Sequence, residues 1–357
     1  MQPIAQAMTN PTLGVTIFVL GGLAGAVFYL PLKKVKIWAW ESYWLLWAVF
    51  ALVVVPLILA FSTSPNWFAV LKQAPSREVW YCYLCGAAWG FGGLTWGLMI
   101  RYLGVGLGLA LGCGLCSAAG TVVPPMLKGQ FAQLFQTSSG QASLVAAVVS
   151  LVGIILVGMA GMSKEKELPE EEKKKAVAEY NFKKGIMIAV FSGIMSAGMS
   201  FGLQGGPEMQ KLAAEVSPPT ALAWQGMPVL VVVLLGGFTV NAIWCLFLNA
   251  KNKTFGDYAK KDAPIMANIF FGAIAGAIWT CQFIAFKTGE PKMGNLGYVG
   301  WAVLMASTIM FSGILGLILG EWKGTSSRTR SLLFAGLVVL LGSAIIAGYS
   351  GYLTQQS

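Results

Sequence analysis

Long runs of hydrophobic residues, separated by short polar connections, dominate the pattern along the chain. Each run has about 20 residues, the length that an α-helix needs to cross a hydrocarbon core about 30 Å thick. The alternation of polar and apolar positions that a membrane strand barrel requires is absent from these runs. Lipid offers the backbone no hydrogen-bond partners, so the runs should be helices. The pattern predicts ten membrane-spanning helices, at roughly 12–32, 40–62, 78–100, 103–126, 141–161, 184–205, 219–248, 264–287, 295–319 and 331–352.

Positively charged residues fall unevenly on the connections between these ten spans. Of the 24 Lys and Arg residues, 18 lie in the odd-numbered connections and six in the even-numbered ones. Lys and Arg favour the cytoplasmic side of a membrane. The odd connections are therefore expected in the cytoplasm, and both termini on the outer, periplasmic side.

One connection, "SKEKELPEEEKKKAVAEYNFKK", is long, polar and mixed in charge. It divides the chain into a first five-helix repeat at 1–162, a charged cytoplasmic linker at 163–183 and a second five-helix repeat at 184–357. An odd number of helices in each half forces the two halves into opposite orientations. The expected architecture is therefore an all-α polytopic membrane protein with ten helices in a 5+5 inverted-topology repeat, as in many transporters.

Weak internal similarity supports a duplication. Gly25-Ala-Val-Phe28 in the first span matches Gly198-Met-Ser-Phe201 in the sixth. The third and eighth spans also correspond, because the Gly86-Ala87 and Gly90 pattern recurs at Gly272-Ala273 and Gly276. Each match falls on corresponding helices of the two predicted halves.

Composition narrows the chemistry that the chain can perform. The chain is 56% hydrophobic and 11% charged and has no histidine, so the commonest metal ligand and general base are missing. Two CxxC pairs, Cys82/Cys85 and Cys113/Cys116, have a spacing that metal sites use. Both lie inside apolar runs, where packing is the simpler interpretation. No metal, no other cofactor and no nucleic-acid partner is expected. An intramembrane enzyme is also disfavoured, because the chain lacks a nucleophile–base pair.

Prolines fall within several of the spans. Pro31, Pro56, Pro124 and Pro228 each remove a helix hydrogen bond and are predicted to kink or interrupt a helix. Broken helices often line the binding site of a transporter. A simple kink remains the alternative for any one of these prolines.

Neutral polar and aromatic side chains within the spans are the candidate binding residues. An unsatisfied amide in hydrocarbon is costly, so each should face another helix or a polar cavity. Amides both donate and accept hydrogen bonds, and aromatic rings cover the apolar face of a sugar. Together they favour a neutral, hydroxyl-rich ligand, although one amide alone is more simply a bridge between helices. The candidate substrate-binding residues are Gln282, Trp279, Asn268, Trp89, Tyr29, Gln204, Gln225 and Asn241.

A few charged residues lie at the ends of the spans, where an ionisable group is a functional hypothesis by default. Glu41 begins the second span and is the candidate proton-coupling residue, with a helix cap as its alternative role. Arg101 ends the third span and Glu321 ends the ninth. These two are expected to have structural or gating roles.

Several stretches together resemble one family. They are "FYLPLKKVKIWAWES", "WGFGGLTWGLMIRYLG", "KKGIMIAVFSGIMSAGMSF", "ANIFFGAIAGAIWTCQF" and "GEW". They cover most of the ten spans in order and resemble the L-rhamnose–proton symporters of the drug/metabolite transporter superfamily. The resemblance implies ten helices in a five-plus-five inverted repeat, the bacterial inner (cytoplasmic) membrane, and sugar uptake driven by protons. It also favours Glu41, Arg101, Asn268, Trp279, Gln282 and Glu321.

The chain departs from that family's pattern where the eighth span meets the ninth. The family has a histidine and an acidic residue there, whereas this chain has "KTGEPKMGNLGYVGW". The departure leaves the exact sugar open. The expected function is proton-coupled import of a neutral monosaccharide, L-rhamnose or a related 6-deoxy sugar, by alternating access. The alternative is an exporter or exchanger of another small metabolite on the same fold. Sodium stays open as the coupling ion, and no obligatory protein partner is expected.

Overall fold

The computed structural model describes residues 10–103, 112, 114–120, 123–124, 126, 129, 131–167, 182–296, 299–320 and 322–356. All regular secondary structure in these residues is helical. Eight helical segments are long and apolar enough to cross a membrane, and they coincide with eight of the ten predicted spans. The chain is therefore a multi-pass membrane protein. The eight segments are Pro11–Leu32, Trp40–Thr63, Gly140–Lys164, Lys183–Glu215, Leu222–Asn252, Ile265–Gly294, Val299–Ile318 and Ser327–Ala347.

The third and fourth predicted spans are not among these eight. The third is present as α7, a continuous helix of 28 residues whose many Gly, Trp and Tyr residues make it less apolar. The fourth, at 103–126, lies mostly outside the described residues. The long helices are α2 (Pro11–Val27), α7 (Ser76–Leu103), α10 (Ser138–Glu167), α12 (Phe182–Gln204), α14 (Met227–Asn252), α15 (Ile265–Gly289), α16 (Val299–Ile318) and α17 (Ser327–Gln356).

Two prolines behave differently from one another. The second span consists of α4 (Trp40–Val49), a π-helical turn at Phe50–Val54 and α5 (Val55–Thr63). Pro56 follows the π turn directly, as expected where a proline removes a helix hydrogen bond. Pro228 was predicted to interrupt the seventh span, and that prediction is wrong. It lies in the first turn of α14, where its missing N–H has no helical partner to lose.

Short helices fill the connections, which the apolar pattern did not predict. Besides α3 (Tyr29–Leu32), which extends α2, they include α6 (Trp67–Gln73) and α13 (Pro207–Glu215), which pack together. The Asn66 side chain joins them, because its amide nitrogen donates to the carbonyls of Ala213 and Val216 at 2.9 and 2.7 Å. The other short elements are α9 (Phe131–Gln136), η2 (Leu222–Trp224), η3 (Phe255–Ala259) and η4 (Glu290–Leu296).

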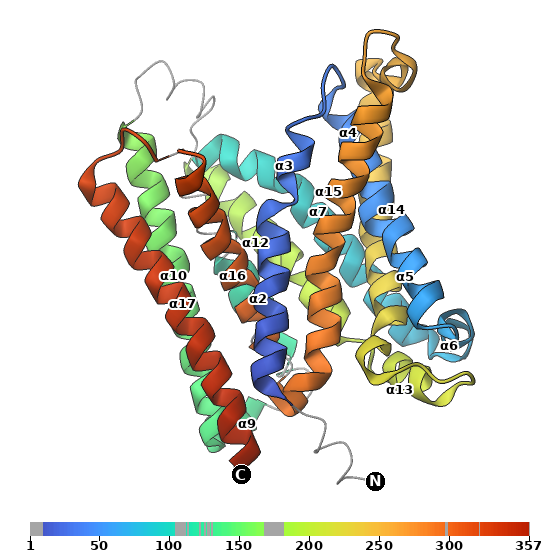
Figure 1. Ribbon diagram of the computed structural model, residues 1–357, viewed down its shortest axis with the longest axis vertical. Helices are drawn as coiled ribbons and strands as arrows, with labels where there is room; N and C mark the ends of the chain where they lie inside the picture. The colour runs from blue at the N-terminus through green and yellow to red at the C-terminus, as the bar shows by residue number, and fades with distance from the viewer. Residues whose placement is uncertain are drawn as a thin grey trace.

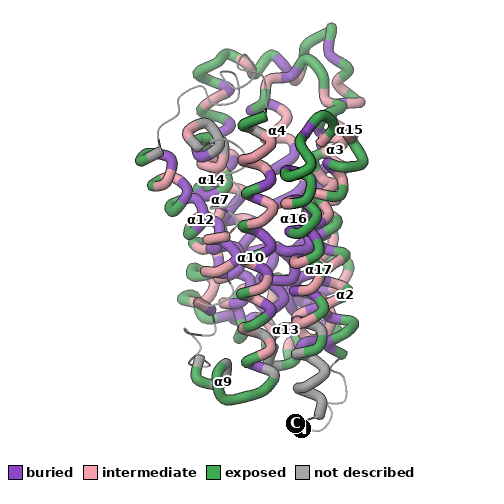
Figure 2. Tube along the Cα trace, turned by 90° about the vertical axis from the view of Figure 1, so that its left-hand side faces the viewer, coloured by how far each residue is buried: buried purple, intermediate pink, exposed green. Residues whose placement is uncertain are grey.

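The long helices form a bundle whose buried residues concentrate in the interior (Figure 2). α10 and α17 pack along each other on one side of the bundle, while α4, α5 and α14 form the opposite side (Figure 1). Between them, α2 packs against α15 and α16, and α7 packs against α12 and α14. The start of α2 and the end of α17 lie at the same end of the bundle (Figure 1).

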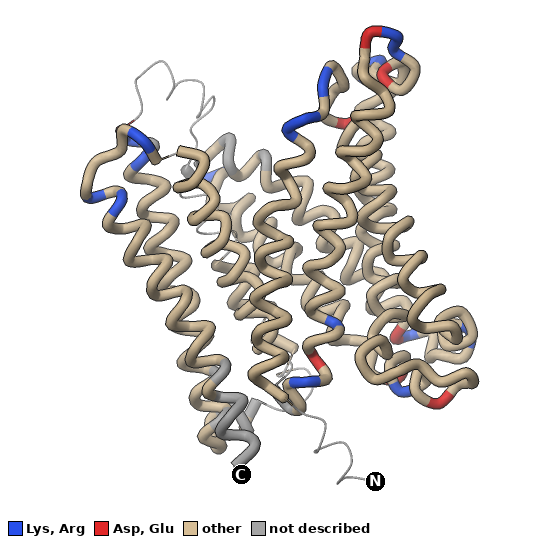
Figure 3. The backbone as a smooth tube through the Cα atoms, in the orientation of Figure 1, with Lys and Arg blue, Asp and Glu red and all other residues tan. Residues whose placement is uncertain are grey.

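Charged residues gather at the two ends of the bundle and are sparse between them (Figure 3). The end that holds the α14–α15 connection and the residues after α3 is rich in lysine and arginine. The opposite end, which holds α13 and the end of α15, has acidic and basic residues together. We refer to the lysine-rich end as the inner end and to the other as the outer end.

Glycines allow two pairs of helices to approach closely. A Cβ atom on Gly86 of α7 would lie 1.9 Å from the carbonyl oxygen of Val233 on α14. A Cβ atom on Gly276 of α15 would lie 2.8 Å from the backbone nitrogen of Ala51, in the π turn of the second span. Only glycine permits backbones to lie this close.

Candidate functional site

An aromatic cluster lies in the interior of the bundle. It consists of Trp44, Trp47, Trp89, Trp279 and Phe283, from α4, α7 and α15. Ring centroids lie 4.4 Å apart for Trp44–Trp47, 5.1 Å for Trp47–Trp279, 5.3 Å for Trp89–Trp279 and 4.6 Å for Trp279–Phe283. Each such pair stabilises the packing by about 0.5–1.5 kcal/mol beyond its buried area. The sequence predicted Trp89 and Trp279, and the structure brings these two together near the midpoints of their helices.

Asn241 on α14 orients one edge of this cluster. Its side-chain oxygen accepts a hydrogen bond of 3.1 Å from the indole N–H of Trp44, and its nitrogen donates to the carbonyl of Gly237 at 2.9 Å. Gly237 in turn lets the Trp89 ring pack on the backbone, since a Cβ atom there would lie 2.6 Å from the ring. Asn241 therefore holds the rings in place with an amide that already has partners.

Gln282 lies one turn from Trp279 along α15, on a neighbouring position of the same face. Its side chain is only 5% exposed and rests on α2, where a Cβ atom on Gly25 would lie 2.0 Å from the Gln282 Oε1 atom. Among the described residues, the Gln282 amide makes no hydrogen bond. A buried amide without a partner costs about 1–3 kcal/mol. In the aromatic cluster, the Trp47 indole N–H is also buried without a partner in the part of the chain that the structure describes. The Gln282 amide and this N–H are therefore two described groups that could bind a polar ligand inside the bundle.

Asn268 and Tyr29, two other predicted binding residues, lie near the inner end instead. The Asn268 oxygen accepts from the backbone N–H of Lys36 at 3.1 Å, and its nitrogen donates to the Lys36 carbonyl at 2.9 Å. The amide thus fixes the connection after α3 to α15. Tyr29 belongs to α3 and is 42% exposed. Neither residue is in the aromatic cluster, although the Phe28 ring lies 6.1 Å from the Tyr29 ring and 5.9 Å from the Trp47 ring and so links them.

Glu41 is the buried carboxylate at the inner end, only 6% exposed. One of its oxygens accepts hydrogen bonds of 2.9 Å from both the Asn252 amide and the Thr254 hydroxyl. Glu41 therefore bonds to the last residue of α14 and to the α14–α15 connection, as well as to its own backbone N–H in the first turn of α4. This contact joins the start of the second span to the end of the seventh.

Asp257 is a second buried carboxylate, beside Glu41, in the α14–α15 connection. It accepts from the backbone N–H of Ala39 at 2.7 Å and from the Ser42 hydroxyl at 2.9 Å. The Tyr258 hydroxyl donates to the Ser42 carbonyl at 3.1 Å, and burial raises the pKa of this tyrosine so that the donor keeps its proton. These bonds make the inner connection a fixed part of the fold. Its signal in the sequence is that Asp257 and Asp262 are the only aspartates in the chain.

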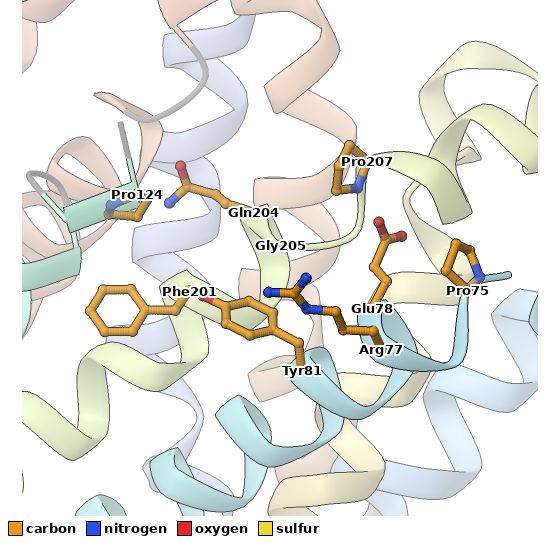
Figure 4. Close-up of a pocket in the computed structure, with 9 residues that line it drawn as sticks. All are labelled: Pro75, Arg77, Glu78, Tyr81, Pro124, Phe201, Gln204, Gly205 and Pro207. Carbon is orange, nitrogen blue, oxygen red and sulfur yellow. The ribbon is translucent and has the colours of Figure 1, made fainter. Parts of the chain in front are cut away.

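Gln204 and Gln225 lie towards the outer end. Gln225 donates to the Thr220 carbonyl at 3.2 Å, beside η2, and is separate from the aromatic cluster. Gln204 donates to the Ser200 hydroxyl at 2.7 Å and lines an open pocket of about 420 Å³ (Figure 4). Sequence reasoning missed the rest of this pocket. It is lined by Pro75, Arg77, Glu78, Tyr81, Pro124, Phe201, Gln204, Gly205 and Pro207.

A buried cation near the outer end was also missed. The Lys287 side chain is 1% exposed, donates to the Leu203 carbonyl at 2.9 Å and pairs with Glu290. The pattern placed Lys287 among the charges of a connection. The remaining candidates are not described: Glu321 and the Arg101 side chain lie outside the described part of the chain.

The comparisons with known proteins cover nearly the whole chain. The family model for the L-rhamnose-proton symport protein (RhaT) matches residues 7–352. The L-rhamnose-proton symporter of Klebsiella pneumoniae subsp. pneumoniae is 32% identical over 341 residues, which are 94% of this chain and 97% of that protein. The L-rhamnose-proton symporters of Cronobacter sakazakii and Citrobacter koseri are each 32% identical over 342 residues, with the same coverage. The chain therefore belongs to the L-rhamnose-proton symport protein family.

Proposed function

We propose that this protein imports L-rhamnose, or a related 6-deoxy sugar, together with protons across the bacterial inner membrane. The observation that carries the proposal is the match to L-rhamnose-proton symporters along 94% of the chain. The family transports its substrate without changing it covalently, so the protein is a symporter and not an enzyme. An exporter or exchanger of another metabolite on this fold is the alternative.

The sugar site that we propose lies between the aromatic cluster and Gln282. Trp279 and Trp89 supply ring faces for the apolar side of a sugar, and the unpartnered Gln282 amide supplies donors and an acceptor for its hydroxyl groups. Asn241 orients the cluster by accepting a hydrogen bond from the Trp44 indole N–H. This location near the middle of the bundle suits a site that alternating access exposes to each side in turn.

Ten helices in a five-plus-five inverted repeat also belong to the proposal. Exchanging the two halves would pair the third span with the eighth and the second with the seventh. Gly86 of the third span is in close contact with the seventh span, and Gly276 of the eighth span is in close contact with the second span. Gly276 occupies the position equivalent to Gly90, so both contacts involve corresponding parts of the two halves. In the same way, Gly25 of the first span packs on the eighth span, and Gly198 of the sixth span packs on the third. These reciprocal contacts support the repeat.

Glu41 is the residue that we propose for proton coupling. Its carboxylate holds the Asn252 and Thr254 side chains, so protonation would weaken the contact between the second and seventh spans at the inner end. Protonation of Glu41 would thereby favour the opening of the inner end of the protein towards the cytoplasm. One proton moving down 100 mV supplies about 2.3 kcal/mol, enough for roughly fortyfold accumulation of a neutral sugar.

The test is uptake of labelled L-rhamnose into proteoliposomes with and without a pH gradient. We expect the wild type to concentrate the sugar only with the gradient. Glu41→Gln should abolish accumulation but keep exchange of internal for external sugar, because exchange needs no net proton movement. If the Glu41→Gln variant still accumulates the sugar, Glu41 is not the proton-coupling residue. Uptake that follows sodium and ignores pH would overturn proton coupling, and covalent change of the sugar would overturn transport as the activity.

A further inference from the structure

The open pocket at the outer end has no role in the site proposed above. It lies where the start of α7, the end of α12 and the start of α13 meet (Figure 4). Its volume of about 420 Å³ falls in the range of small-molecule sites, about 300–1,000 Å³. It lies beside α13, which is at the same end of the bundle as the start of α2 and the end of α17 (Figure 1).

The side chains around this pocket differ in whether they are free to bind a ligand. The Glu78 carboxylate is occupied, since it accepts from the backbone N–H groups of Glu208 and Met209 at 3.2 and 2.8 Å. These bonds hold the first turn of α13 over one side of the pocket. The neighbouring Arg77 guanidinium makes no hydrogen bond or ion pair with any described residue. Its five N–H donors therefore remain available beside the pocket.

Aromatic rings and one amide complete the lining. Tyr81 packs on Gly205, where a Cβ atom would lie 2.2 Å from the ring, and Phe201 lies across the pocket from the α7 residues (Figure 4). Gln204 is buried, and its amide nitrogen already donates to the Ser200 hydroxyl and the Gly120 carbonyl, so the group it has left for a ligand is its side-chain oxygen. Ring faces beside a guanidinium and an amide match the apolar and hydroxyl sides of a sugar.

Among the described residues, α12 and α16 contact the segment 116–120 below the pocket. One turn below Gln204, the Ser200 hydroxyl donates to the Gly120 carbonyl at 2.7 Å. The Trp301 indole N–H donates to the Cys116 carbonyl at 3.3 Å, so α16 reaches the same segment.

We propose that this pocket is an outer vestibule site for a neutral monosaccharide. Arg77 and Gln204 bind sugar hydroxyl groups there, and Tyr81 covers the apolar face of the ring. The inference rests on the proposed function, because it treats the pocket as the first station of imported sugar. It adds a binding site distinct from the one between the aromatic cluster and Gln282.

Labelling of one introduced cysteine tests occupancy directly. Pro207 lines the pocket and is exposed but is not one of the three proposed contacts, so Pro207→Cys places a thiol there. In right-side-out vesicles a membrane-impermeant maleimide should label this thiol, above the level of the unsubstituted protein, and excess L-rhamnose should slow the reaction. Adding Arg77→Gln should remove the protection. Lys211→Gln removes another exposed cation of the outer end that does not line the pocket, and should leave protection unchanged.

Transport kinetics give a second readout. Arg77→Gln and Tyr81→Ala should raise the half-saturation concentration for uptake from outside by about three- to tenfold, with little change in maximal rate. Efflux from the inside should keep its half-saturation value, since the vestibule faces outward. Equal effects of Arg77→Gln and Lys211→Gln, or protection by a sugar acid but not by L-rhamnose, would overturn the vestibule.

The two proposals fail in different ways. If the wild type takes up no L-rhamnose but the sugar still protects Pro207→Cys, the symport proposal fails, and the pocket stands as a sugar-binding site but not as a station of import. If uptake is driven by protons but no protection occurs, the vestibule is wrong and the symport proposal stands. Absence of both uptake and protection overturns both.

Discussion

At the residue scale, the contact between Gly25 and Gln282 decides how the proposed sugar site is shaped. The three described atoms nearest to a Cβ at Gly25 belong to the ends of the Gln282 and Thr308 side chains. Because these nearest atoms are side-chain ends and not backbone, we expect a small side chain on α2 to turn the amide without separating the helices. Glycine at this position therefore fixes where the amide points.

Gly25→Ala should accordingly weaken sugar binding and leave the fold intact. Loss of one well-aligned hydrogen bond, worth about 0.5–1.5 kcal/mol, predicts a half-saturation concentration about three- to tenfold higher. Gly14→Ala is the matched control on the same helix, because there the added carbon meets the flexible end of Met293 near the outer end. Uptake at varied L-rhamnose concentration measures both. Unchanged half-saturation in Gly25→Ala would show that the orientation of Gln282 does not matter for the sugar.

At the element scale, the first turn of α17 is capped from another helix. Glu167, at the end of α10, accepts from the backbone N–H of Ser326 at 2.6 Å and from the Ser326 and Thr329 hydroxyls at 2.5 Å. Ser326 itself caps the helix by accepting from the Thr329 backbone N–H at 3.2 Å. The hydrogen bonds from Ser326 and Thr329 lower the pKa of Glu167 to about 2. The carboxylate thus couples the ends of α10 and α17.

Glu167→Gln should lower the thermal stability of the purified protein at neutral pH. Because the pKa of Glu167 is lower in the folded protein than its usual 4.5, its stabilising effect is fully present above that value. It is lost as pH falls from about 4.5 towards 2, where the carboxylate takes up a proton in the folded state too. The difference in Tm between wild type and Glu167→Gln should therefore shrink across this range. Lys166→Gln, a neighbouring exposed change, should show no such trend.

The sequence predicted the long elements well and their connections poorly. A span such as 264–287 is defined by its composition alone, and α15 (Ile265–Gly289) begins and ends within two residues of it. The fold of α6 against α13 depends on Asn66, whose amide bonds to carbonyls about 150 positions later in the chain. No local pattern contains that information.

The candidate site was predicted in part for the same reason. Trp89 and Trp279 share mid-depth positions on predicted helices, which periodicity and length can place. Asn268 also lies on α15, but its partner is the backbone of Lys36, in a connection whose path the sequence does not specify. Arg77 and Tyr81 line a pocket formed by three elements, so their role depends on packing and not on their own helix.

At the scale of the whole molecule, the distribution of charge assigns the two ends to the two sides of the membrane. The inner end holds most of the lysine and arginine of the described residues, while the outer end mixes both signs (Figure 3). The preference of cations for the cytoplasm predicts that the α14–α15 connection faces inward and that α13 faces outward. The vestibule, the direction of import and the position of Glu41 all depend on this orientation.

Two single cysteines would establish the orientation. Lys260 lies exposed in the α14–α15 connection, and the Lys211 side chain on α13 is 61% exposed. In right-side-out vesicles a membrane-impermeant maleimide should label Lys211→Cys and spare Lys260→Cys, and inverted vesicles should reverse the result. The unsubstituted protein gives the background from the native cysteines. Labelling of Lys260→Cys from outside would contradict this orientation. Glu41 would then face the side from which protons enter, and the vestibule would open into the cytoplasm.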